Sequence, residues 1–487
     1  MLDRARGGQR LPGSAAVWIL LPVLFYMFAR GFFAPTDPDY WWHVRTGQLI
    51  VETGAIPRTD PFSYTAAGKP WVTHEWLSEV LLYEVSSAFG YVGNVVLFGL
   101  VTAATWGMVY ATCRASGAGE PVAAVLALLG FATAMQSLNV RPQGFTTLFV
   151  AMVALGYALQ RRGRGAWLWM STPLILLLWV NLHGGYIFGL GLIVAALLAQ
   201  VVSAHPGRRL GAIRRDSLLL VLGLAATVAN PSGVRALAYP FTYAGTANAS
   251  MRYIVEWQSP NFHSSGFYYL AIAVTSLAAL GAGLSRTNLT QAVWALVALP
   301  MALLSARHVP LFAVLVVPVL AERLANTHLV FARPLSHWRR ARMFVLTWPL
   351  VVAAVVALIL QPDAPAAQFG RDASPGTFPH GAVAAIRADH LQGNLFNEYG
   401  WGGYLIHELY PEHRVFVDGR ADVYGDEFIE QYMAVAGLKP GWQAILDRYQ
   451  VNLVVVEKDG PLAAAFSMDD GWDLLYEGDV EKLFRRR

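Results

Sequence analysis

Two carboxylates near the start of the chain could do acid–base chemistry. Asp37 and Asp39 flank Pro38 directly after a long apolar run over 15–34. Because proline fixes its own backbone and disfavours a helix at the preceding residue, both carboxylates are held at the end of that run. An ionised, partly desolvated carboxylate can take a proton from a hydroxyl group. We therefore expect one of the two to be a general base and the other a helix N-cap, for which Asp39 is suitably placed.

Two histidines and a glutamate accompany these acids in the same segment of the chain. The side chains of His43, His74 and Glu75 could orient the base, donate a proton or bind a cation. Oxygen and imidazole ligands together suit a divalent metal, although the spacing here matches no standard metal motif. The candidate catalytic residues, with any metal unknown, are Asp37, Asp39, His43, His74 and Glu75.

Arginines further along the chain could bind an anion. Arg141 lies in NVRPQ, and Arg307 stands beside His308 in SARHVPLF. A planar guanidinium group binds a phosphate with two parallel hydrogen bonds. We expect Arg141, Arg307 and His308 to contact the phosphate of a donor substrate. For Arg141, a salt bridge to an acid of the earlier segment explains the residue equally well.

Polar and aromatic residues elsewhere complete the candidate site. In NLHGGY the two glycines permit a tight turn, which leaves the polar residues of that string unexplained. The string EWQSPNF adds an acid, although an acid in a polar loop is more often solvated than catalytic. Tryptophan often anchors a helix at the membrane surface, which is the alternative explanation for Trp42. The candidate substrate-binding residues are Trp42, Asn181, His183, Glu256 and Trp257.

The composition indicates a polytopic membrane protein. Of the 487 residues, 55% are hydrophobic and only 14% are charged, whereas a soluble domain has about 25% charged residues. Mean hydropathy is +0.41. The basic residues fall mainly in short loops between apolar runs, where they are topology signals rather than a nucleic-acid surface. The single cysteine, Cys113, excludes an intrachain disulfide framework and a cysteine-rich metal site.

About eleven transmembrane helices are expected, since a span needs about 20 mostly apolar residues. Arginines cluster in alternate connections, which predicts a cytoplasmic N-terminus and an exterior C-terminus. The candidate residues then all belong to the exterior side. The expected spans are 15–34, 93–112, 121–137, 144–160, 167–182, 185–204, 217–232, 267–284, 289–304, 309–325 and 343–360.

Two further parts of the chain are expected outside the membrane. The first exterior loop, 35–92, contains two amphipathic stretches, 41–54 and 73–90, that we expect to be interfacial helices. A Pro/Ala/Gly-rich linker over 361–379 leads to a soluble α/β domain over 380–487. There RVFVDGR and VNLVVVEKD are expected to be strands, and WDLLYEGDVEKLFRR a hairpin. In the first of these strands, Asp418 and Arg420 are expected to form an internal ion pair.

Several strings resemble a group of bacterial membrane proteins that is placed beside the C-type integral-membrane glycosyltransferase superfamily. These strings are DPDYWWHVRTGQLI, DPFSYTAAGKPWVTHEWLSEVLLY, NLHGG, NEYGWGGYLIHEL and VFVDGRADVY. The superfamily combines many spans with a large first exterior loop that bears two interfacial helices. An acidic motif follows its first span, and DPD at 37–39 matches that position. Members use polyprenyl-phosphate-linked sugars on the exterior face of the membrane.

The resemblance implies a hexosyl- or pentosyltransferase of the bacterial inner membrane. Asp37 or Asp39 would activate an acceptor, and Arg141 and Arg307 would hold the lipid phosphate. Its partners would be the lipid bilayer, a polyprenyl-phosphate sugar and an unknown glycan, lipid or protein acceptor, with no nucleic acid. A transporter or flippase, and a non-catalytic envelope assembly protein, are the alternatives. The spans contain almost no ionisable residues and show no internal repeat, which speaks against a transporter.

Overall fold

The structure is a computed structural model that describes residues 37–135, 139–164, 167, 170–202, 206–243, 252–261, 263, 289–325 and 376–487. Within these ranges, eight helices coincide with eight of the nine expected spans between 93 and 325. The expected spans 15–34, 267–284 and 343–360 lie outside the described residues, as does most of the expected linker. The helices are α3 (Trp76–Ala115), α4 (Glu120–Ala134), α5 (Gln143–Arg161), α7 (Thr172–Leu182), α8 (Tyr186–Val202), α9 (Pro206–Val228), α13 (Leu289–Leu304) and α14 (Val309–Ala325).

These helices form a bundle with an apolar surface. Three described segments, Trp76–Ala115, Gln143–Arg161 and Ala306–Ala325, are long and apolar enough to cross a membrane. The helices carry exposed apolar side chains, among them Leu100 at 57% and Val125 at 65% exposure. Exposed apolar surface of this kind marks a contact with a membrane or with a partner protein. Because three of the segments are also long enough to cross a bilayer, we interpret the bundle as that of a membrane protein.

The first loop contains the two expected helices. The first is α2 (Pro38–Thr53), and the second is the early part of α3. Gly90 interrupts α3 with φ 64° and ψ −168°. Only glycine adopts this backbone conformation readily, so the chain can change direction here between the loop helix and the following span. The first helix starts earlier than expected because Asp37 is its N-cap, with its carboxylate accepting from the Asp39 backbone N–H at 3.0 Å.

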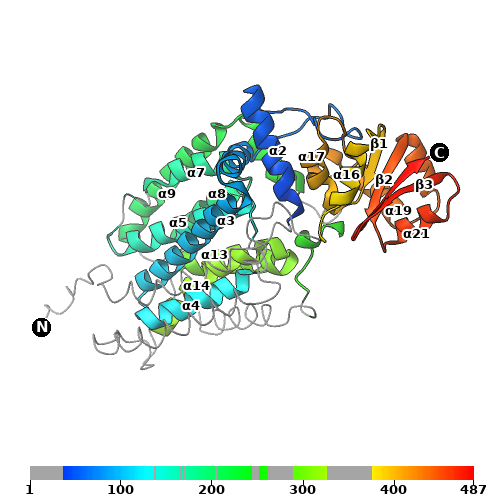
Figure 1. Ribbon diagram of the computed structural model, residues 1–487. Coiled ribbons are helices and arrows are strands. Elements are labelled where there is room, and N and C mark those ends of the chain that lie inside the picture. The colour runs from blue at the N-terminus through cyan, green and yellow to red at the C-terminus, as the bar shows by residue number, and fades with distance from the viewer. Residues whose placement is uncertain are drawn as a thin grey trace, which may run out of the picture.

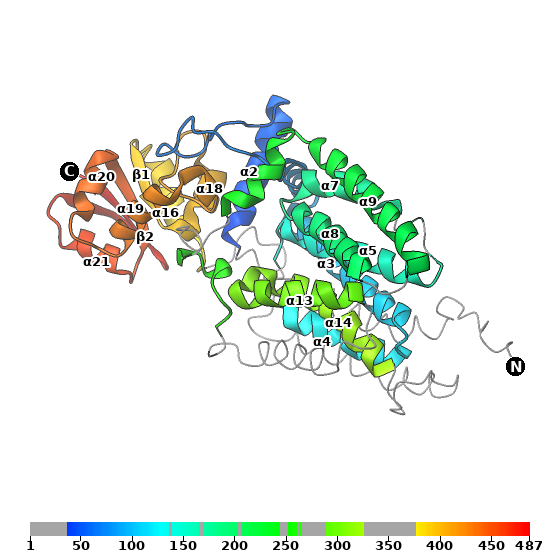
Figure 2. The ribbon, with the colours of Figure 1, turned by 180° about the vertical axis from the view of Figure 1, so that it is seen from behind.

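The helix α2 lies between the bundle and the C-terminal domain, as Figures 1 and 2 show from opposite sides. The ring of Trp41 packs against Phe378, Tyr404 and His407 of that domain, with centroids 5.1–5.8 Å apart. Trp41 and Trp42 are only 4% and 7% exposed. The alternative explanation of Trp42 as an anchor at the membrane surface is therefore wrong, because protein encloses its ring. The ring of Trp41 is enclosed in the same way.

Residues 376–487 form an α/β unit around a four-stranded sheet of order β1-β2-β4-β3. The first pair of strands is parallel and the other two pairs are antiparallel. The expected hairpin is present as β3 and β4. The elements are α16 (His380–Ala388), β1 (Asn394–Asn397), α17 (Gly402–Leu409), α18 (Ala421–Tyr424), α19 (Asp426–Ala436), α20 (Trp442–Arg448), β2 (Val451–Glu457), α21 (Pro461–Ser467), β3 (Trp472–Glu477) and β4 (Glu481–Arg486).

The expected strand RVFVDGR makes only isolated bridges, through Val415. Its backbone groups are satisfied in another way. The Val415 N–H donates to the Phe62 carbonyl at 3.0 Å, and the Thr65 hydroxyl donates to the Phe416 carbonyl at 2.6 Å. The side chain of Asn397 accepts from the Phe416 N–H and donates to the Val417 carbonyl. The first loop thus takes the place of a neighbouring strand.

Arg420 joins the C-terminal domain to the first loop. Its guanidinium group forms a two-pronged pair with Asp418, at 2.8 and 2.6 Å, which confirms the expected ion pair. The same group reaches Asp60 of the first loop at 2.8 Å. It also lies over the rings of Phe62 and Trp71, 5.0 and 4.7 Å from their centroids. This buried contact fixes the domain against the loop.

Candidate functional site

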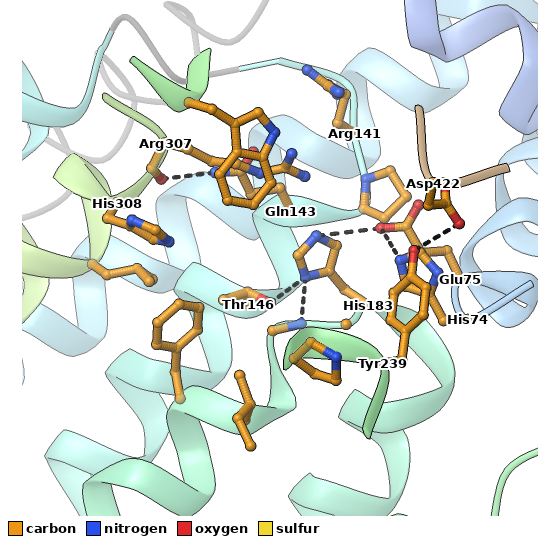
Figure 3. A pocket seen from close by; sticks show the side chains of 18 of the residues that line it. His74, Glu75, Arg141, Gln143, Thr146, His183, Tyr239, Arg307, His308 and Asp422 are labelled. Carbon is orange, nitrogen blue, oxygen red and sulfur yellow. Dashed lines mark hydrogen bonds and ion pairs between the residues drawn. The ribbon is translucent and has the colours of Figure 1, made fainter. Parts of the chain in front are cut away.

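A cavity of about 830 Å³ lies where the bundle, the first loop and the C-terminal domain meet (Figure 3). Part of its wall is apolar and comes from α8, α13 and α14, with side chains such as Leu192, Val297 and Leu315. The rest is polar. Ten of the candidate residues line it: Asp39, Trp42, His43, His74, Glu75, Arg141, His183, Trp257, Arg307 and His308.

Asp37, Asn181 and Glu256 do not line the cavity, and each has another structural position. Asp37 caps α2. Asn181 accepts from Trp76 Nε1 at 2.8 Å and donates to the carbonyls of Leu177 and Ala229, which ties α3 to α7 and α9. These contacts use the amide of Asn181 within the protein. Glu256 lies between two arginines.

Arg141 is the centre of a buried charge cluster. Its guanidinium group pairs with Asp39 and Glu256, and its Nε lies 3.5 Å from Asp37 Oδ2. The alternative explanation of Arg141, a salt bridge to an acid of the first loop, is therefore confirmed. Three carboxylates thus surround one guanidinium group. Arg307 approaches one of these carboxylates, with Nη1 3.8 Å from Glu256 Oε2.

Asp37 and Asp39 have different environments. Asp39 accepts from Trp42 Nε1 at 3.1 Å and faces the cavity. Burial raises the pKa of Asp39 above the ordinary value, against the opposing charge of Arg141. Burial likewise raises the pKa of Asp37 to about 6. A methyl group at Gly419 would overlap with Asp39 Oδ1, so the C-terminal domain contacts this carboxylate through a bare backbone.

Arg307 is positioned by an aromatic ring and by the neighbouring helix. Its guanidinium carbon lies 5.0 Å from the ring centroid of Trp257, and its carbonyl accepts from Gln143 Nε2 at 3.0 Å. Beside it, the His308 ring contacts Phe188, with centroids 5.4 Å apart. A second arginine side chain thus lines the cavity.

Glu75 is surrounded by three imidazole rings. Its carboxylate oxygens lie 3.6 Å from His43 Nε2, 3.5 Å from His74 Nε2 and 3.3 Å from His183 Nε2. Burial acts to raise the pKa of Glu75, but His74 and the other imidazoles hold it well below the usual range. Glu75 is therefore ionised at neutral pH. These histidines come from α2, from the start of α3 and from the turn after α7.

The hydrogen bonds of His183 determine where its proton lies. The Gly185 N–H donates to His183 Nδ1 at 2.9 Å, so Nδ1 carries no hydrogen. The Thr146 hydroxyl accepts a hydrogen bond from Trp179 Nε1. It therefore donates its own hydrogen to His183 Nδ1, which lies 2.7 Å away. The Nε2–H therefore faces Glu75. Burial lowers the pKa of His183 to about 3, which agrees with a neutral ring.

His74 carries the positive charge that balances Glu75. Its Nδ1 donates to the Val72 carbonyl at 3.1 Å, so contact of Nε2 with Glu75 needs a second proton. Burial acts to lower the pKa of His74, but Glu75 raises it above the ordinary value. Burial lowers the pKa of His43 to about 3, and this ring stays neutral. Within the described ranges, no group of three or more His, Cys, Asp or Glu side chains could hold a metal ion.

The cavity also has lining residues that sequence reasoning missed. Gln143 and Thr146 lie on the first turns of α5, just after Arg141. Glu79 lies on α3, four residues after Glu75. Their spacing from Arg141 and Glu75 could have identified all three residues. Tyr239 and Asp422 come from distant segments, and no local pattern connects them to the site. The sequence predicts an ion pair for Arg420 but not its place in the cavity wall.

The comparisons with known proteins concern the fold of the chain. No protein-family model and no curated protein matches the sequence. The structure of the archaeal oligosaccharyltransferase AglB from Archaeoglobus fulgidus, with an inhibitory peptide and a dolichol-phosphate, has TM-score 0.55 and 12% identity to this chain. That match covers 96% of this chain and 74% of AglB.

A second similar structure is the arabinofuranosyltransferase AftD from Mycobacteria, with TM-score 0.53 and 14% identity. The match covers 98% of this chain but only 40% of AftD, so this chain spans less than half of that enzyme. One of these proteins is thus an oligosaccharyltransferase and the other an arabinofuranosyltransferase. The chain shares the fold of these two enzymes.

Proposed function

We propose that this protein transfers a sugar from a polyprenyl-phosphate donor to an acceptor on the exterior face of a bacterial inner membrane. The observation that carries the proposal is the composition of the cavity wall. Asp39, Arg141 and Arg307 face a space that is continued by apolar side chains of α8, α13 and α14. A ligand with a charged phosphate and a hydrocarbon chain matches such a wall.

Asp39 is the base in this proposal. An acceptor hydroxyl attacks the anomeric carbon of the donor, the bond from that carbon to the phosphate oxygen breaks, and the hydroxyl proton passes to Asp39. The polyprenyl phosphate leaves with the bonding electrons. Asp39 lines the cavity, whereas Asp37 caps α2. Because burial raises the pKa of Asp39, it is a stronger base than an ordinary aspartate.

Arg307, together with Arg141, would stabilise the leaving phosphate. Negative charge accumulates on the phosphate oxygens as the glycosidic bond breaks, and fixed cations at that point lower the barrier. In the free protein, Glu256 contacts both guanidinium groups. A phosphate dianion would compete with Glu256 for these donors. The dolichol-phosphate in the AglB structure supports a lipid phosphate as the ligand class.

The proposal is tested by replacing each aspartate separately. We expect Asp39→Asn to lower transfer from a labelled polyprenyl-phosphate sugar in membrane vesicles about 10²–10⁴-fold, because the general base is lost. Asp37→Asn is the comparison variant, since asparagine caps a helix as well as aspartate does, and it should lose far less activity than Asp39→Asn because the base is kept. Expression in the membrane is checked for each variant.

Two results would contradict the proposal. Full activity of Asp39→Asn would exclude Asp39 as the base. Absence of transfer by the wild-type protein with every donor tested would exclude the glycosyltransferase function itself and favour a transporter or an assembly protein.

A further inference from the structure

A group of polar side chains in the cavity has no role in the transfer step described above. It consists of His74 of the first loop, Tyr239 of the short 3₁₀ helix Tyr239–Tyr243, and Asp422 of the C-terminal domain. In Figure 3 these residues and Glu75 lie on one side of His183, and Arg307 and His308 lie on the other. The group therefore shares the cavity with the proposed phosphate site but occupies a different wall.

The three side chains hold one another in place. The rings of His74 and Tyr239 pack with centroids 4.4 Å apart at an angle of 37°. The Tyr239 hydroxyl donates to Asp422 Oδ2 at 3.0 Å. His74 is itself fixed by the Val72 carbonyl and by Glu75. The carboxylate of Asp422 is thus positioned by a chain of contacts that starts in the first loop.

Asp422 has unused hydrogen-bonding capacity. A carboxylate offers about four acceptor sites, and within the described residues the Tyr239 hydroxyl is the one side chain that donates to it. Tyr239 contacts it, and a second aromatic side chain, Phe241, lines the same cavity. A fixed acceptor beside apolar rings suits a ring-shaped ligand that bears hydroxyl groups.

We propose that His74, Tyr239 and Asp422 form a subsite for the hydroxyl groups of a sugar ring. The inference rests on the proposed function, which requires a sugar in this cavity. The carboxylate of Asp422 accepts from one or two ring hydroxyls, and the aromatic side chains cover the apolar face of the ring. A site built to hydrogen-bond a hydroxyl discriminates strongly against a ligand that lacks it. The same chemistry fits the sugar of the donor and the sugar of a glycan acceptor, and binding measurements separate these two.

The test uses the full-length protein in lipid nanodiscs and follows its tryptophan fluorescence, because Trp42, Trp71 and Trp257 line the cavity. The probes are undecaprenyl phosphate, the same lipid phosphate carrying mannose, glucose or arabinose, and methyl glycosides of these sugars added with saturating undecaprenyl phosphate. The variants are Asp422→Asn and Tyr239→Phe. Asp447→Asn is the control, because Asp447 is 62% exposed and pairs with Arg486 on α20 and β4 of the same domain.

For a donor subsite, at least one sugar-bearing lipid binds the wild type about 10-fold or more tightly than undecaprenyl phosphate alone. Asp422→Asn removes this gain and leaves the affinity for undecaprenyl phosphate unchanged. For an acceptor subsite, Asp422→Asn instead abolishes binding of a methyl glycoside. Tyr239→Phe weakens the same interaction, and Asp447→Asn changes nothing.

Three results would overturn the inference: no sugar-dependent affinity in the wild type, wild-type affinities in both variants, or an equal loss for every probe including undecaprenyl phosphate. The last result would show a structural contact only. Since binding is measured without transfer, failure of this subsite is distinguishable from failure of the proposed reaction.

Discussion

The Asp39 carboxylate shares a buried cluster with Asp37, Arg141 and Glu256, and the state of each group depends on the others. Arg141 contacts all three carboxylates. Burial raises the pKa of Asp39, the charge of Arg141 lowers it, and the charge of Glu256 raises it. The proposed base is active only when it is ionised, so the cluster determines the lower end of the pH range in which transfer proceeds.

Replacing Glu256 should shift this limit. As pH falls through the pKa of Asp39, the base becomes protonated and kcat/KM declines. Because the pKa of Asp39 is raised, this decline occurs at a pH above the ordinary aspartate pKa of 3.8. Glu256→Gln removes a negative charge and leaves Arg141 more available to Asp39, and both changes lower the pKa of Asp39. We therefore expect the acid limb of the kcat/KM–pH profile to move to lower pH.

The control for this experiment is Glu430→Gln, because Glu430 pairs with Arg252 outside the cavity. Its profile should coincide with that of the wild type. An acid limb that does not move in Glu256→Gln would show that Asp39 is not the group that limits activity at low pH.

At the scale of the elements, the break in α3 determines how the first loop meets the bundle. Gly90 separates the loop helix, which carries Glu75 at its N-cap, from the span that continues to Ala115. The loop helix contributes its polar end to the cavity, while the span belongs to the apolar bundle. One residue in an unusual conformation therefore connects two environments.

Gly90→Ala should destabilise the protein by about 1–3 kcal/mol, because a side chain strains the backbone at φ 64° and ψ −168° even though no atom lies near the new methyl group. Thermal unfolding in detergent measures the change. Gly211→Ala in α9 is the control: it also meets no neighbouring atom, lacks a positive φ, and should be neutral or slightly stabilising. Equal unfolding temperatures for the two variants would contradict the strain argument.

At the scale of the whole molecule, the first loop and the C-terminal domain act as one unit. The contacts at Asp60, Phe62 and Thr65 all join the loop to residues 415–420. A methyl group at Gly403 of α17 would overlap with the Pro38 carbonyl of α2, which shows how closely the domain approaches this helix. The cavity wall includes residues from both partners.

Arg420→Lys should weaken this unit although it keeps the charge. Lysine cannot reproduce the two-pronged pair with Asp418 together with the contact to Asp60, so we expect a loss of about 1.5–3 kcal/mol in the free energy of unfolding. Calorimetry of the purified protein measures it. Arg387→Lys, at an exposed pair with Glu408, should change stability by no more than about 0.5 kcal/mol. A loss of the same small size for Arg420→Lys would contradict the assigned role.

The sequence predicts the spans well because a membrane helix is specified by a local run of apolar residues. It also predicts that Asp39, Glu75, Arg141 and His183 share one face, because topology signals are local too. The division of roles between Asp37 and Asp39 depends on the residue at which α2 begins, and neighbouring residues do not fix that point. The contributions of Tyr239 and Asp422 depend on tertiary contacts across 183 residues, which no pattern in either segment records.

The link between the first loop and the C-terminal domain sets an order of events during synthesis. The Thr65 hydroxyl finds its partner, the Phe416 carbonyl, 351 residues later in the chain. At roughly 5–20 residues per second, a ribosome needs about 20–70 s to make that interval. During this time the loop has been made but lacks the residues that complete its fold. The proposed sugar transfer can therefore begin only after the final domain has been made, so each newly made molecule is expected to stay inactive until its translation is nearly finished.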